Sequence, residues 1–76
     1  MNKQRRALLQ RAKSALETAE GLVDQALWEE QDCLSNMPEN LESTERYEKM
    51  ENAIELMEEA LENIRGAAEN LDSAAE

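Results

Sequence analysis

The second half of the chain repeats its apolar residues with a strict period. Between Tyr47 and Ala75 they recur at alternating steps of three and four residues through four heptads. The positions are Tyr47, Met50, Ile54, Met57, Leu61, Ile64, Ala68, Leu71 and Ala75. This spacing places all of them on one face of an α-helix, as in the seam of a left-handed coiled coil. We therefore expect a long helix over residues 43–75 that packs lengthwise against another helix.

The first half has the same seven-residue period and a wider apolar stripe. One file of residues seven apart contains Leu9, Leu16 and Val23, and the next contains Ala12, Ala19, Ala26 and Cys33. The residues that flank these files are Leu8, Ala15, Leu22, Leu27 and Leu34. We expect a helix over residues 3–34 whose alanine file, with Cys33 as a small buried thiol, faces the second helix.

A break separates the two periodic stretches at residues 35–42. Pro38 disfavours helix at the residue before it, and the polar residues around it favour a turn. Ser43 is the expected N-cap of the second helix, where Glu45 and Glu48 favour the positive end of the helix dipole. Two helices of equal length with a short connection predict one all-α domain over residues 1–76, an antiparallel two-helix hairpin.

The alanines predict how the two helices align. In the second helix an alanine precedes each of four seam residues, at positions 53, 60, 67 and 74. Small residues that face each other let two helices approach closely. The predicted pairs are Ala12 with Ala67, Ala19 with Ala60 and Ala26 with Ala53, and the residue numbers of each pair add to 79.

The apolar stripe of the first helix is too wide for one partner helix to cover. A two-helix pair is a single layer, and a large exposed apolar area commonly marks an interface. A second copy of the chain is the simplest cover and would give a four-helix bundle. The expected oligomer or partner interface consists of Leu8, Leu22, Leu27 and Trp28. Trp28 either packs over the turn at residues 37–41 or anchors a partner, and we prefer the first interpretation.

Charge is distributed unevenly along the chain, which has 18 acidic and 8 basic residues and a net charge of -10. The basic cluster at the N-terminus, where there are no acids, consists of Lys3, Arg5, Arg6, Arg11 and Lys13. It either binds phosphates of RNA or a nucleotide, or balances the acidic last turns of the second helix. The lack of interleaved aromatic residues favours the second interpretation. The acidic remainder repels nucleic acid and membrane surfaces and attracts basic partners.

The sequence contains little that is suited to catalysis or metal binding. It has no histidine and one cysteine, Cys33, so the usual nitrogen and sulfur metal sites are unavailable. No nucleophile stands near a base, and no stretch is apolar enough for a signal-peptide core or a membrane span. We expect a cytoplasmic protein without enzyme activity, cofactor or metal.

The stretch from Asn36 to Leu71 opens on Asn-Met-Pro-Glu-Asn-Leu and continues through Arg46, Tyr47 and Glu48 into glutamate-rich heptads. It resembles small acidic helical-hairpin proteins encoded by phages and prophages of Gram-positive bacteria, and it covers about half of the chain. The resemblance implies a location in the cytoplasm of a bacterial host. That group has no defined activity, so the resemblance assigns no functional residues.

These features lead to three expected functions. The first is an interaction module that inhibits a basic host or defence protein, with acidic side chains that imitate nucleic-acid phosphates. The expected acidic surface consists of Glu51, Glu55, Glu58 and Glu62. The alternatives are a structural or regulatory homo-oligomeric bundle, and a small RNA- or nucleotide-binding hairpin that uses the basic N-terminus.

Overall fold

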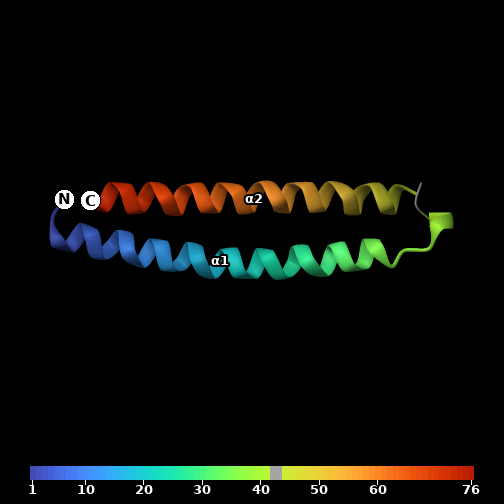
Figure 1. The fold of residues 1–76 in the computed structure, drawn as a ribbon, viewed down its shortest axis with the longest axis horizontal. Coiled ribbons are helices and arrows are strands. Elements are labelled where there is room, and N and C mark those ends of the chain that lie inside the picture. Colours follow the sequence, from blue (N-terminus) through green and yellow to red (C-terminus); the bar gives the residue numbers. More distant parts are fainter. Residues whose placement is uncertain (42–43) are drawn as a thin grey trace.

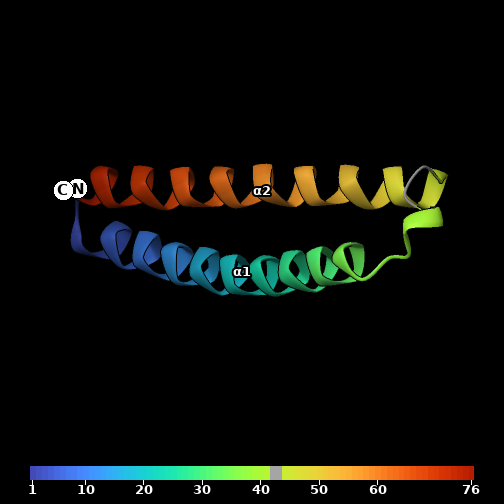
Figure 2. The ribbon, with the colours of Figure 1, turned by 45° about the vertical axis from the view of Figure 1, so that its right-hand side comes forward.

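The chain folds into two long antiparallel α-helices. The computed structural model describes residues 1–41 and 44–76. Helix α1 spans Lys3–Ser35, the 3-10 turn η1 spans Glu39–Leu41, and helix α2 spans Glu45–Ala75. The two helices lie side by side along their length, with the two ends of the chain together at one end of the rod (Figures 1 and 2). The predicted all-α hairpin is confirmed.

Each helix begins at a side chain that caps it. The Oδ1 atom of Asn2 accepts a hydrogen bond from the backbone N–H of residue 5 at 2.8 Å. At α2 the hydroxyl oxygen of Thr44 accepts from the backbone N–H of residue 47 at 3.3 Å, and the hydroxyl donates to the Leu41 carbonyl at 2.7 Å. Thr44 is thus the N-cap of α2. The predicted cap, Ser43, lies outside the described residues.

The core is small and belongs mainly to α2. Met50, Ile54 and Leu61 are the buried residues of the described chain, and α1 contributes none. All three lie in the seam predicted for α2, so that prediction is confirmed. On α1 the predicted file of Leu9, Leu16 and Val23 is half-buried. The resulting rod measures 59 × 14 × 13 Å.

The second file that α1 presents to α2 differs from the predicted one. Ala12, Ala26 and Cys33 are exposed and only Ala19 of this file is half-buried, so the prediction of a core-facing alanine file with a buried thiol is wrong. The half-buried file that takes this place contains Lys13, Glu20, Leu27 and Leu34. Leucines bury more apolar area than alanines. Long charged side chains such as those in this file can cover a seam with their apolar stems while their charged ends reach polar partners.

The alignment of the helices also differs from the prediction. Lys13 pairs with Asp72 and Glu20 pairs with Arg65, and the residue numbers of each pair add to 85 instead of 79. The difference of six residues corresponds to about 9 Å along the helix axis. In consequence the first turns of α1 extend past the C-terminal end of α2 (Figure 1). We call residues 3–8 the N-terminal overhang.

Neither helix in the described part of the chain has an apolar stretch long enough to cross a membrane.

Candidate functional site

The hairpin has two broad faces of different character. Going around α1, the file of Lys13 and Glu20 lies on one side of the Leu9 file and the alanine file lies on the other. On α2 the file of Arg65 and Asp72 likewise lies opposite the alanine file across the seam. The observed ion pairs join Lys13 to Asp72 and Glu20 to Arg65. The charged files of the two helices therefore lie on the same broad face of the hairpin. One broad face is therefore ion-paired, and both alanine files lie on the other.

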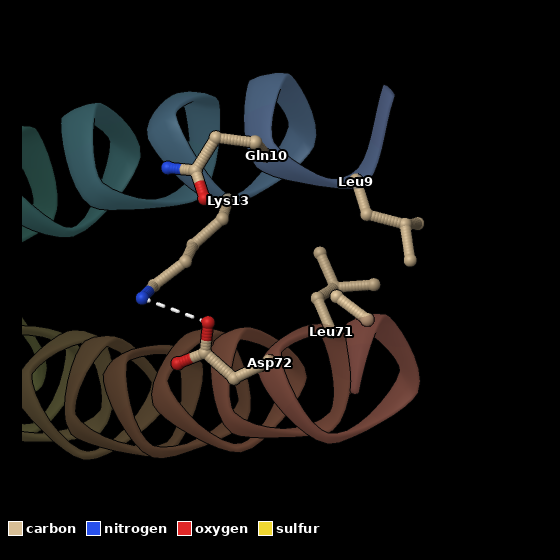
Figure 3. Close-up of a pocket in the computed structure, with 6 residues that line it drawn as sticks. Leu9, Gln10, Lys13, Leu71 and Asp72 are labelled. Carbon is tan, nitrogen blue, oxygen red and sulfur yellow. Dashed lines mark ion pairs between the residues drawn. The ribbon is translucent and has the colours of Figure 1, made fainter. Parts of the chain in front are cut away.

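We call the end of the rod that holds both chain termini the open end. Near it, on the ion-paired face, Lys13 connects the two helices. Its Nζ atom lies 2.9 Å from Oδ1 of Asp72. The side chain reaches from α1 toward α2 beside Leu9 and Leu71, which lie at the same end of the seam (Figure 3). The hydrogen bond to Asp72 raises the pKa of Lys13 above its ordinary value. This pair shows which residues of the two helices lie opposite each other near the chain ends.

Near the middle of the same face, Arg65 bridges two acids of α1. Its Nε atom lies 2.6 Å from Oε2 of Glu20, and its Nη2 atom lies 3.8 Å from Oδ1 of Asp24. The hydrogen bond to Glu20 raises the pKa of Arg65. This cluster was not predicted from the sequence. The signal for it is that residues of opposite charge, one on each helix, have residue numbers that add to 85, as Glu20 and Arg65 do.

A shallow groove follows this cluster toward the turn. Its lining residues are Asp24, Leu27, Glu58, Leu61, Glu62 and Arg65. Leu27, which the sequence left for a partner, is half-buried here beside the buried Leu61. Its apolar surface thus contributes to the seam of the hairpin itself.

The predicted acidic surface lies along α2 on the side of the ion-paired face. We call the set of Glu51, Glu55, Glu58 and Glu62 the acidic stripe. All four are exposed, and none takes part in an ion pair among the described residues. They occupy two adjacent files and extend over about 16 Å of helix. Their charge is therefore available to a cationic surface.

The basic cluster divides into two parts. Lys13 forms an ion pair with Asp72. This is one pair of the kind predicted between the basic cluster and the acidic last turns of α2. Lys3, Arg5, Arg6 and Arg11 are exposed and make no ion pair within the described chain. Three of these four belong to the N-terminal overhang. The open end of the rod thus keeps a concentration of unpaired positive charge.

The other broad face carries small and exposed apolar side chains. We call it the apolar face and define it by the alanine files of the two helices, Ala12, Ala19, Ala26 and Cys33 of α1 and Ala53, Ala60, Ala67 and Ala74 of α2. Leucines form its rim, and their exposed fractions are 58% at Leu8, 65% at Leu22 and 57% at Leu56. Leu56 was missed from the sequence because it lies outside the seam, in an otherwise polar file with Lys49 and Asn63.

Trp28 lies away from this face. Its file is on the outer side of α1, nearer the ion-paired face, and 66% of its surface is exposed. The preferred interpretation, in which Trp28 is covered by packing over the turn, is wrong. The side chain is instead free to contact solvent or a partner.

The described residues contain no group of three or more acidic, cysteine or histidine side chains placed to hold a metal ion. Cys33 is exposed and is not in a disulfide. Comparison with known proteins finds no matching family model, no matching curated protein and no matching solved structure.

Proposed function

We propose that this chain is a non-catalytic protein-interaction module of the phage or mobile-element type. In this proposal the acidic stripe occupies a basic, nucleic-acid-binding groove of a host or defence protein and inhibits it. The observation that carries the proposal is that four exposed glutamates on one side of α2 lack ion-pair partners among the described residues.

The geometry of the stripe supports this kind of mimicry. Successive glutamates are three or four residues apart, which separates them by about 4.5 to 6 Å along the axis. Phosphates of one DNA strand follow one another at about 3.4 Å along the duplex axis, so both surfaces present a dense row of negative charge. The row is rigid because it stands on a continuous helix, which lowers the ordering cost of binding.

Displacement of DNA from a basic-groove nuclease tests the proposal. The full-length protein should compete a labelled DNA duplex off the nuclease, and the competition should weaken as salt rises, because exposed charges are screened. Competition should weaken about 10-fold or more in the combined variant Glu51→Gln, Glu55→Gln, Glu58→Gln and Glu62→Gln. Each contact between opposite charges contributes at least several tenths of a kcal/mol to the binding free energy.

A matched variant separates the position of the charges from their number. Glu17→Gln, Glu29→Gln, Glu39→Gln and Glu59→Gln remove four exposed glutamates outside the two files of the acidic stripe and leave the same net charge. This variant should compete nearly as well as the parent protein. Equal loss in both variants, or competition that salt does not affect, would contradict charge mimicry. Direct binding of the labelled duplex to the chain would instead support the nucleic-acid-binding alternative through the basic cluster.

A further inference from the structure

We propose that the apolar face binds a second copy of this chain in antiparallel orientation. The two hairpins then form a four-helix bundle in which the open end of each rod lies on the turn end of the other. In this arrangement α1 packs on α1 of the partner subunit and α2 packs on α2 of the partner subunit. The acidic stripe lies on the other side of the hairpin, so this inference stands apart from the proposed function.

The unfilled side of the seam is the first argument. The half-buried residues of the seam on the side of the apolar face are Leu9, Leu16, Val23, Met57, Ile64 and Leu71. A second layer on this face would bury them together with Leu22 and Leu56. The outline of the rod on this side is 59 Å by 14 Å, a projected area of the same order as the ~800 Å² of accessible surface that each partner buries in a stable interface.

The alanine files indicate that the face fits a copy of itself. On α1 the file is centred between Ala19 and Ala26, and on α2 it is centred between Ala60 and Ala67. With the alignment fixed by Lys13 and Asp72, these two centres lie at the same height on the rod to within about 1.5 Å.

A two-fold axis through this common centre therefore places small residues against small residues on both helices. Ala19 faces Ala26 of the partner subunit, and Ala60 faces Ala67 of the partner subunit. Leu22 lies at the axis against Leu22 of the partner subunit. Such self-complementarity is what a symmetric two-fold interface requires.

Charge selects the antiparallel orientation. The open end of the rod, residues 1–13 and 72–76, carries five basic and two acidic side chains. The described turn end, residues 29–41 and 44–51, carries two basic and seven acidic side chains. An antiparallel pair places each positive end on a negative end, whereas a parallel pair would place like charges together. The N-terminal overhang then lies over the turn of the partner subunit, close to Glu39 and Glu45.

The first test is the mass of the protein in solution. Analytical ultracentrifugation should show a dimer of the 8.6 kDa chain, and a monomer at concentrations up to 1 mM, roughly the limit of weak association, would overturn the proposal. Leu22→Lys places two lysines at the two-fold axis and should weaken the dimer about 100-fold or more. Trp28→Lys alters an equally exposed residue off the apolar face and should leave the dimer intact. Circular dichroism checks that both variants remain helical.

Cross-linking tests the orientation. In the antiparallel pair residue 12 lies at the height of Cys33 of the partner subunit, whereas two copies of Cys33 lie about 31 Å apart along the axis. Ala12→Cys should therefore form a covalent dimer on mild oxidation, while the parent protein and the double variant Ala12→Cys/Cys33→Ser should not. Cross-linking through Cys33 alone, or none in Ala12→Cys when a dimer is present, would overturn the antiparallel arrangement.

Discussion

Leu61 has the smallest exposed fraction in the described chain, 4%. It lies where α2 meets Leu27 of α1 in the central groove. Leu61→Ala removes three buried carbons from a seam that has few other buried groups. We expect the free energy of unfolding to fall by about 2 kcal/mol, the lower end of the usual range because a two-helix seam relaxes easily. Urea unfolding followed by circular dichroism measures this as a lower midpoint.

The matched control for this prediction is Trp28→Ala. Trp28 is larger than Leu61 but 66% exposed, so its removal should change the free energy of unfolding by no more than about 0.5 kcal/mol. A larger loss at Trp28 than at Leu61 would show that the stability of the hairpin does not follow burial.

Individual residues also show what the sequence could not specify. Periodicity identifies the seam of α2 because its apolar file is bordered by charged residues on one side. On α1 the apolar stripe is wider than the seam. Either the alanine file or the file of Leu27 and Leu34 could therefore face α2 beside the Leu9 file. The file that faces α2 contains Leu27 and Leu34, and its Lys13 and Glu20 form ion pairs with α2. Pairings between residues so distant in the sequence cannot be read from a local pattern.

At the scale of single helices, the two glycines are weak points rather than packing devices. Gly21 lies inside α1 and Gly66 inside α2, and a Cβ atom at either position would meet no atom within 4 Å apart from its chain neighbours and the adjacent backbone of its own helix. Glycine in a helix interior costs about 1 kcal/mol relative to alanine. Gly21→Ala and Gly66→Ala should therefore each stabilise the hairpin by about that amount in urea unfolding.

A third alanine substitution separates helix propensity from a general effect of alanine. Gln31 is exposed on α1 and already has good helix propensity, so Gln31→Ala should change stability little. Destabilisation by Gly21→Ala or Gly66→Ala would mean that the glycine makes a close contact with a second chain. Equal gains at all three positions would contradict the argument from glycine.

Helix extents followed from the sequence more closely than helix alignment did. The expected helix over residues 3–34 corresponds to α1 at Lys3–Ser35, because Pro38 and the polar residues around it end the pattern sharply. The predicted alignment was wrong because it was based on the alanines, which lie beside the seam on the apolar face and are exposed or half-buried. The candidate surfaces were predicted by residue type, but their division between two opposite faces required the structure.

At the scale of the whole molecule, the rod is too thin to form a closed core. Its radius of gyration is 17.3 Å, whereas a compact domain of this length would have about 11 Å. A single layer of two helices leaves every seam residue near solvent. The four ion pairs between described residues join exposed or half-buried side chains, and ion pairs at a protein surface add little stability. In the proposed dimer a second layer would bury the side of the seam that the single hairpin leaves near solvent.

The proposed dimer predicts that thermal stability rises with protein concentration. When unfolding and dissociation are coupled, each tenfold increase in concentration adds about 1.4 kcal/mol per dimer. With an unfolding entropy of about 2.1 cal/mol/K per residue, two chains of this length should gain about 4 °C in Tm per tenfold increase. Thermal unfolding followed by circular dichroism over a hundredfold range of concentration measures the slope. Leu22→Lys should remove the dependence and Trp28→Lys should retain it, whereas a Tm that is constant for the parent protein would mean that the single hairpin folds alone.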